Sequence, residues 1–518
     1  MQNSEKKLHI PELSISVFAR YISFLFIEAP ELSDIMYLYM SVISPHFRFS
    51  GELYMQKHIK IAYIGGGSKQ WARVFMSDLA VSEGLSGQIA LYDLDLEAAH
   101  RNAAIGQRIN QNPAAKSHFE YTVCPRLEDA LEGADFVIIS ILPGTFRDMR
   151  SDVHAPEAYG VYQSVGDTAG PGGILRAMRT VPYYEEFARK IRDICPNAWV
   201  LNFTNPMSIC VKTLYDVFPQ IKAFGCCHEV FHAQDLLTCV LKEVRGIQAD
   251  RKEIYTDACG INHFTWITEA KYQNIDLLAL LPEFMDRFYE EGYYEGYDRF
   301  AFRHDPFAYG NKVKLDLFRK YGALAAAGDR HLAEFVSNLW YLRDPDTVRS
   351  WQFGLTTVDF REKQQAERVA ETIAYADGSK PFPLEGSSEE AVDLMKALMG
   401  MKTVVSNVNL PNRGQMPQMP LGSIVETNCV FSNDQVNPVA AKPLPSAAAN
   451  LVHRCCLNVD TTYEGIKERD LSKLFAAFVN QPLCSSLTME QCEELFRQMC
   501  YNTREYLDPY FDLDAYFR

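Results

Sequence analysis

Short apolar runs alternate with longer amphipathic runs along the first half of the chain. The apolar runs predict buried strands, and the runs between them carry apolar residues at helical spacing, which predicts helices. The predicted strands cover 60–64, 88–92, 134–140, 197–203 and 222–225, and the predicted helices cover 71–82, 96–110 and 209–217. Strand–helix–strand units of this length favour an α/β fold with a Rossmann-type parallel sheet.

The two periods mix in the second half of the chain, which predicts an α+β region. Helical spacing covers 231–243, 277–291, 388–398 and 489–506, and strand-like runs cover 254–259 and 424–431. A chain of 518 residues is about twice as long as one hydrophobic core usually organises. We therefore expect two domains, a Rossmann-type domain over 55–225 and an α+β domain over 226–518.

Residues 1–54 differ from the rest because they are rich in Phe, Tyr, Ile and Ser and show no clear period. The first predicted strand begins shortly after Met55. Two interpretations are open: a targeting or docking segment, or an extension outside the fold with Met55 as the native start. We expect the second. The uncharged runs 21–27 and 35–47 are shorter than the ~20 residues that a membrane span needs.

Composition and charge exclude several classes of protein. Apolar residues make up 47% and charged residues 23% of the chain, which is typical of a soluble globular protein rather than a disordered chain or a coiled coil. The formal net charge of −15 repels phosphate backbones, so we expect no nucleic-acid partner. The 13 cysteines are scattered along the chain, which indicates a reducing, cytoplasmic location. We expect no membrane association.

A glycine run at the first predicted strand-to-helix turn suggests a dinucleotide site. The run includes Gly65 and Gly67 and ends at Ser68, and such a turn lets backbone N–H groups approach a pyrophosphate. Gln70 takes the place of the third glycine of the usual fingerprint. Asp93 closes the second strand, where a carboxylate accepts ribose hydroxyls and disfavours a 2′-phosphate, so we expect NAD rather than NADP. The alternative is a plain turn with a solvated aspartate.

Two short segments in the middle of the chain suggest a metal site. Cys227 and His228 follow one predicted strand, and Asn262 and His263 follow another. A thiolate and an imidazole can together hold a divalent transition metal. The sequence has no second CxxC or HxxxH to close a four-ligand structural zinc site. The alternative is that both residues belong to the core.

Further polar residues lie where ligands could reach them. Asp329 follows a glycine in an alanine-rich stretch, which makes it a candidate general base, or else a helix N-cap. Asp167 lies in the run 165–173, which we interpret as a loop too rich in glycine to form a helix. Asn202 and Asn205 follow a predicted strand, at the edge where open α/β sheets bind ligands. Turn formation is the alternative for Asp167 and Asn205.

Taken together and in this order, these motifs resemble family 4 of the glycoside hydrolases from about residue 57 to the C-terminus. The segment 409–415 is also similar. The tetrapeptide at 227–230, Cys-His-Glu-Val, resembles the α-galacturonidase branch of that family. NAD-dependent glycosidases of family 4 stand outside the usual two-carboxylate mechanism. The resemblance implies a lactate/malate dehydrogenase-like architecture, a homodimer or homotetramer, and catalysis and metal binding in the region 226–518.

The implied reaction is the hydrolysis of α-linked galacturonides or related α-glycosides. It proceeds by NAD-assisted oxidation at C3, loss of the C2 proton with elimination, addition of water and re-reduction, so the cofactor is restored in each turnover. The resemblance implies that Cys227 and His263 bind Mn²⁺ or a similar ion. It makes His228 the proton donor to the leaving group, and it places Asn205, with Asp167 as a partner, at the substrate hydroxyls.

The resemblance leaves two roles open. Asp329 is the implied proton acceptor, and Tyr321 is the alternative because some branches of the family use a tyrosine. A galacturonate carboxylate also needs a cation, and Arg147, Arg176 and Arg330 are available.

Two other functions remain possible from the sequence. A lactate/malate-type dehydrogenase would share the first domain and release NADH, although the Cys227 and His263 pair would then have no task. A non-catalytic NAD-binding regulatory protein would bind the cofactor without any turnover.

Overall fold

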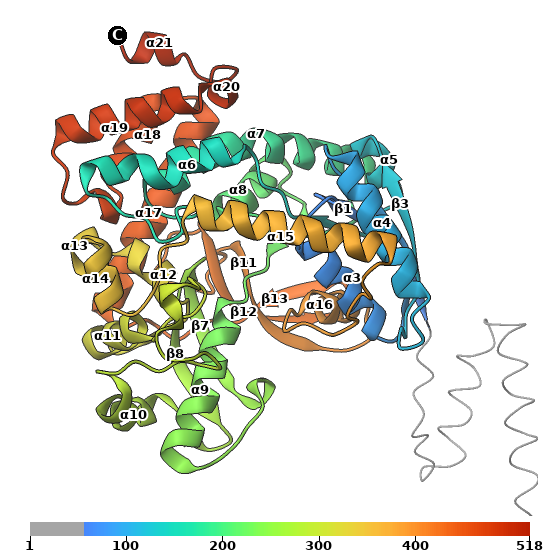
Figure 1. Ribbon diagram of the computed structural model, residues 1–518, viewed down its shortest axis with the longest axis horizontal. Coiled ribbons are helices and arrows are strands. Elements are labelled where there is room, and N and C mark those ends of the chain that lie inside the picture. The colour runs from blue at the N-terminus through green and yellow to red at the C-terminus, as the bar shows by residue number, and fades with distance from the viewer. Residues whose placement is uncertain (1–55) are drawn as a thin grey trace, which may run out of the picture. The chain divides into compact units, whose positions relative to one another are not determined.

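A computed structural model describes residues 56–518, and the predicted extension 1–54 lies outside the described residues (Figure 1). Six strands of the first half form the parallel part of one sheet, in the order β3-β2-β1-β4-β5-β6. This order confirms the predicted Rossmann-type fold. The strands are β1 (Lys57–Ile64), β2 (Leu85–Tyr92), β3 (Phe119–Cys124), β4 (Phe136–Ile139), β5 (Trp199–Asn202) and β6 (Lys222–Gly225).

Helices cover both faces of this parallel sheet. Alternate residues of β1 enter different cores, because Ile61 and Tyr63 pack on one face whereas Ala62 and Ile64 pack on the other. Burial on both faces explains why these strands read as continuous apolar runs. The helices are α3 (Trp71–Val81), α4 (Leu96–Asn110), α5 (Leu127–Leu131), α6 (Phe146–His154), α7 (Gly170–Ile194) and α8 (Met207–Val217).

The sheet continues into the second half of the chain with antiparallel strands. Asn409 pairs with Gly225, and the order then runs β6-β11-β12-β7-β8-β10. Strands of both halves therefore share one sheet, and the division into two domains at residue 225 stays a prediction. The strands are β7 (Tyr255–Ile261), β8 (Phe264–Tyr272), β9 (Ile275–Asp276), β10 (Leu324–Ala325), β11 (Val404–Pro411), β12 (Ile424–Ser432) and β13 (Gln435–Pro438).

Helices of the second half surround these strands. Figure 1 shows the long helix α15 passing α4 and α6, against which it packs. Only Val358, Thr372 and Tyr375 of α15 are buried, so its apolar pattern is too weak for a prediction. The helices are α9 (Glu229–Arg245), α10 (Leu281–Phe288), α11 (Lys312–Tyr321), α12 (Asp329–Leu332), α13 (Asn338–Tyr341), α14 (Pro345–Ser350), α15 (Val358–Asp377), α16 (Ala391–Leu398), α17 (Ser446–Glu468), α18 (Leu471–Val479), α19 (Met489–Asn502), α20 (Arg504–Leu507) and α21 (Leu513–Tyr516).

The prediction that residues 165–173 form a loop is wrong at its end, because α7 begins at Gly170. Pro171 stands in the first helical turn, where its missing N–H costs nothing. The glycines allow close packing rather than flexibility. A Cβ on Gly172 would lie 2.7 Å from the carbonyl oxygen of Gly166, and one on Gly173 would lie 2.5 Å from that of Thr168.

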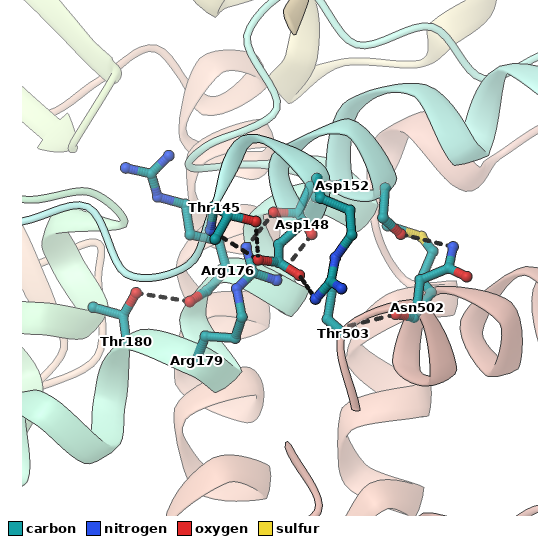
Figure 2. A network of polar contacts seen from close by, with 12 residues as sticks. Thr145, Asp148, Asp152, Arg176, Arg179, Thr180, Asn502 and Thr503 are labelled. Carbon is teal, nitrogen blue, oxygen red and sulfur yellow. Dashed lines mark hydrogen bonds and ion pairs between the residues drawn. The ribbon is translucent and has the colours of Figure 1, made fainter. Parts of the chain in front are cut away.

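A buried polar network joins α6 to α7 (Figure 2). Arg179 donates to both carboxylate oxygens of Asp152, with Nη1 3.0 Å from Oδ1, and both side chains are 2% exposed. Asp148 takes part in the N-terminal cap of α6, where its side chain accepts a hydrogen bond from the Thr145 N–H at 2.8 Å. At the edge of the network, the Asn502 side chain at the end of α19 donates to α6. The network therefore fixes the segment that leads into Asp167 and α7.

Within residues 56–518, no helix combines the length and the apolar character that crossing a membrane requires. All 13 cysteines carry free thiols.

Replacing Arg179 with Met should lower the free energy of unfolding by about 3–5 kcal/mol, because the Asp152 carboxylate would stay buried without its counter-charge. Urea unfolding followed by circular dichroism measures this loss. The matched control is Arg192→Gln on α7, whose side chain is 46% exposed and pairs with Asp193 at the surface, and it should leave the unfolding curve unchanged. An Arg179→Met curve that overlays the wild-type curve would contradict the assignment.

Candidate active site

The predicted site residues follow the carboxyl ends of neighbouring parallel strands. The glycine run follows β1, Asp93 follows β2, Asn205 follows β5 and Cys227 follows β6. Because the carboxyl ends of parallel strands meet at one edge, these residues share the edge at which open α/β sheets bind ligands.

The glycine turn after β1 is held tightly against the sheet. Gly65 has φ +95°, and a Cβ there would lie 2.0 Å from the carbonyl oxygen of Ser140, so only glycine fits. The Gly67 N–H donates to Asp93 Oδ2 at 2.8 Å, and the Asp95 N–H donates to Asp93 Oδ1 at 2.9 Å. Each carboxylate oxygen of Asp93 keeps a second lone pair, which a ligand hydroxyl could use.

Asn102 on α4 holds the glycine turn in place, and the motifs in the sequence did not point to it. Its side-chain amide donates to the carbonyl oxygens of Gly66 at 2.7 Å and Ser68 at 2.9 Å, and the residue is completely buried. The signal was present, because Asn102 is the one strongly polar residue on the apolar face of the predicted helix 96–110.

The N-terminus of α3 is open to an anion. No side chain caps it and no acidic residue stands in its first turn. Arg73 in that turn is 7% exposed and donates to the Lys69 carbonyl oxygen at 2.7 Å. Free N–H groups and the positive end of the helix dipole suit the binding of a phosphate group.

Glu229, the first residue of α9, lies buried among four histidines. Its Oε2 accepts the Gly328 N–H at 2.7 Å, and its Oε1 lies 3.7 Å from His331 Nε2 and 3.9 Å from His228 Nε2. Burial opposes its ionisation, but the nearby histidines, including His232 and His263, hold the pKa of Glu229 well below its usual range. In the sequence, Glu229 stands out only as a member of the tetrapeptide 227–230.

Two groups of side chains have the spacing of metal ligands. The donor atoms of Asp167, His263 and His331 lie within 4.8 Å of one another, and those of His228, Glu229 and His232 do so as well. His263 stands in the turn between β7 and β8 with φ +63°. No sequence pattern pointed to His331, because only the fold brings it to His263.

The first of these groups has the electrostatics of a metal site. The rings of His263 and His331 are 4.1 Å apart, and Thr168 Oγ1 lies 3.1 Å from His263 Nδ1. Burial lowers the pKa of both histidines and thus favours the neutral form that binds metals. Burial acts against the charge of Asp167, but Arg176 and the two histidines hold its pKa below its usual range.

Cys227 belongs to neither group. It is 7% exposed and packs with Met207, Val211 and Ile424. Burial, and then the charges of Glu426 and Glu229, raise the pKa of the Cys227 thiol well above its usual range. The thiolate would therefore need a bound cation to form.

Asp329 and Tyr309 lie side by side. Asp329 Oδ1 accepts the Lys314 N–H at 3.0 Å, whereas Oδ2 is buried and has no partner among the described residues. Burial raises the pKa of Asp329 to about 6. A Cβ on Gly328 would lie 3.0 Å from the ring of Tyr309, and burial with the charges of Glu229, Glu295 and Asp329 raises the Tyr309 pKa.

Tyr321 lies in different surroundings. It ends α11, its ring packs against Trp266 at 5.9 Å, and the charge that acts on it is that of Asp316. Tyr309, which packs against Gly328, therefore lies nearer to Asp329 than Tyr321 does.

Several buried amide groups near the edge of the sheet lack partners within residues 56–518. They are Asn205 Oδ1 and both polar side-chain atoms of Asn262, and Asn205 also accepts from Arg176 Nε at its carbonyl, at 3.1 Å. Buried polar atoms are rarely left unpaired, so a ligand with hydroxyl groups would satisfy them. Asn202, in contrast, is already paired, with Tyr184 and Thr204.

Comparisons with known proteins agree across almost the whole described chain. The model of family 4 glycosyl hydrolases matches residues 60–243, and the model of the C-terminal domain of that family matches residues 258–484. The α-galacturonidase of Thermoanaerobacterium saccharolyticum is 49% identical over 87% of this chain and 97% of its own length. The α-galacturonidase of Bacillus subtilis is 46% identical over 85% of this chain and 96% of its own.

Solved structures agree as well. The crystal structure of the Bacillus subtilis protein LplD superimposes with a TM-score of 0.80 and 45% identity, over 85% of this chain and 99% of that one. A 6-phospho-α-glucosidase from gut microorganisms, in complex with NAD and Mn²⁺, shares the fold with a TM-score of 0.70 and 21% identity, over 87% of this chain and 99% of that one.

Replacing Asn102 with Ala should weaken NAD⁺ binding about tenfold or more, because the glycine turn would lose two buried hydrogen bonds, each worth about 1 kcal/mol. Titration calorimetry measures the affinity. Asn110→Ala on the same helix is the matched control, since the Asn110 amide donates to the Phe119 carbonyl oxygen at 2.7 Å, away from the turn. Equal NAD⁺ affinity in the Asn102 variant and the wild type would contradict this role.

Proposed function

The chain belongs to family 4 of the glycosyl hydrolases, and on that basis we propose that it is an α-galacturonidase. It would hydrolyse α-linked galacturonides with NAD and a divalent ion such as Mn²⁺ as cofactors. The observation that carries the proposal is the gathering of an open helix N-terminus, a cluster of metal-type ligands and an unpaired buried carboxylate beyond one edge of the sheet. The relatives named α-galacturonidase support the substrate class.

The residues around the glycine turn fit a dinucleotide. Gly65, Gly67 and Ser68 would lie along the pyrophosphate at the start of α3, and Asp93 would accept the ribose hydroxyls. The uncapped start of α3 supports this assignment, because an acidic residue in the first turn would repel the phosphates.

The neutral imidazoles and the ionised carboxylate of Asp167, His263 and His331 fit a divalent ion. We propose His263 as a ligand with Asp167 and His331 beside it, and Cys227 as the thiolate ligand that the family resemblance implies. When bound, NAD supplies a hydride acceptor for C3 of the sugar, and the ion polarises the oxygens at C2 and C3.

His228 would donate a proton to the leaving glycosidic oxygen. Its Nδ1 lies 3.2 Å from Glu389 Oε1. Burial lowers its pKa, but the hydrogen bond to Glu389 and the charge of Glu229 outweigh burial and raise the pKa of His228 above its usual value. A protonated imidazole near neutral pH is the form that a general acid needs.

Asp329 would accept the C2 proton. Its Oδ2 is unpaired, and burial keeps its basicity above that of an ordinary carboxylate. If a tyrosine takes this role, the surroundings support Tyr309 rather than Tyr321. Asn205, with its free Oδ1, would bind substrate hydroxyls together with Asp167.

Family membership does not favour a dehydrogenase that releases NADH or a regulatory protein without turnover. We propose that the enzyme works in the cytosol, which its 13 free thiols support, and as a homodimer or homotetramer, as the resemblance implies.

The proposed reaction leaves a label that tests it. Turnover of an aryl α-galacturonide in D₂O with NAD⁺, Mn²⁺ and a reducing agent should place deuterium at C2 of the released sugar, because the C2–H bond is broken. Proton NMR of the product measures the incorporation. Direct displacement at the anomeric carbon never breaks that bond, so an unlabelled product from active enzyme would refute the mechanism.

Substitution of the candidate bases should separate their roles. Asp329→Asn should lower kcat about 10²-fold or more, the usual scale for losing a general base, while Tyr321→Phe should stay close to wild type. NAD⁺ affinity, measured by calorimetry, should be unchanged in both. An active Asp329→Asn variant together with an inactive Tyr309→Phe variant would transfer the role to Tyr309.

A further inference from the structure

Three arginines lie around the segment that carries Asp167, and none of them forms a close ion pair with a carboxylate among residues 56–518. Arg176, Arg330 and Arg361 make their hydrogen bonds to neutral oxygens, and no carboxylate among residues 56–518 lies within 4.0 Å of their guanidinium groups. Arg179 lies on the same helix as Arg176 but differs from it, since Arg179 is paired with the carboxylate of Asp152 (Figure 2). In a chain with a net charge of −15, unpaired arginines gathered at one site indicate an anionic ligand.

The three arginines differ in which of their guanidinium N–H groups remain free for a ligand. Arg361 is held by the backbone, with Nε 3.1 Å from the Thr356 carbonyl oxygen and Nη2 2.7 Å from that of Val165. Arg176 uses Nε for the carbonyl oxygen of Asn205. The Nε–H edge of both guanidinium groups is therefore occupied.

Arg330 keeps that edge free. It uses Nη1 to donate to Thr356 Oγ1 at 2.9 Å, so Nε and Nη2 remain available side by side. Its guanidinium carbon lies 4.4 Å from the centre of the Phe307 ring, and this stacking holds the plane of the group. Two parallel N–H groups on a fixed plane match the two oxygens of a carboxylate.

The position of Arg330 fits one particular carboxylate. Arg330 stands between Asp329 and His331 on α12, and Glu229 joins the start of this helix, through Gly328, to His228. In a pyranose ring C5 is bonded through the ring oxygen to C1, where His228 would act, and it lies across the ring from C2. A carboxylate on C5 would therefore lie one ring atom from the position at which His228 would act, and away from the proton at C2.

We infer that Arg330 binds the C6 carboxylate of the galacturonide through Nε and Nη2, and that this contact selects uronides over neutral galactosides. The inference rests on the proposed function. It also selects one of the three arginines that the sequence analysis named for this carboxylate. Arg147 is a poor candidate because it is 65% exposed and already pairs with Glu505.

Calorimetric binding of D-galacturonate and D-galactose to the enzyme with NAD⁺ and Mn²⁺ tests this contact without turnover. Arg330→Gln should weaken galacturonate binding roughly 30-fold or more, the usual scale for losing one partner of a buried charge pair, and should leave galactose binding unchanged. Arg330→Lys keeps the charge but loses the two parallel N–H groups. Its affinity for galacturonate should therefore lie between that of the wild type and that of Arg330→Gln. Arg147→Gln is the matched control and should bind as the wild type does.

Kinetics with aryl α-galacturonides and α-galactosides that carry the same leaving group give a second measurement. Arg330→Gln should lower kcat/KM for the galacturonide by a similar factor and leave the galactoside unaffected. Unchanged galacturonate affinity in Arg330→Gln, or equal losses for both sugars, would overturn the inference. A wild type that binds galacturonate but never cleaves a galacturonide would instead contradict the proposed function and leave the Arg330 contact standing.

Discussion

The carboxylate of Glu229 connects parts of the site that are far apart along the chain and in the sheet. It begins α9 directly after β6, and it accepts the N–H of Gly328, which follows β10 at the far end of the antiparallel strands. The imidazoles of His228 and His331 flank its Oε1. A buried carboxylate is stable only with such partners. The same contacts therefore keep Glu229 ionised and hold α12, with Asp329 and Arg330, against the edge of the sheet.

Several polar groups at the site are buried without partners, and the stability of the rest of the scaffold offsets the free-energy cost of burying them. Asn205 Oδ1, the Asn262 amide and Asp329 Oδ2 are buried without partners within residues 56–518, and each such group costs about 1–3 kcal/mol. Other polar groups of the scaffold are held by ion pairs or hydrogen bonds, such as Asp152 by Arg179 and the Asn102 amide nitrogen by the glycine turn.

The sequence predicted five of the six parallel strands, missed β3 and the helices α5 to α7, and predicted the site in part. The helix 96–110 and the strand 222–225 were predicted with the observed bounds, because strands buried on both faces and amphipathic helices leave strong local patterns. Helix α15 has no such local pattern, since few of its residues are buried. His331 and Tyr309 could not be found either. Their neighbours His263 and Glu229 are distant in sequence, and only the packing of α12 brings them together.

The pairing of β6 with β11 also has a consequence for synthesis on the ribosome. The core that covers one face of β1, around Ile59 and Ile61, includes Val408, Leu410 and Phe431 from β11 and β12. These side chains are made long after the parallel strands, and β13 is the one strand of the described chain that follows them. During synthesis, part of the apolar surface of the first half therefore stays exposed to solvent. This core is complete only after residue 431 has been translated.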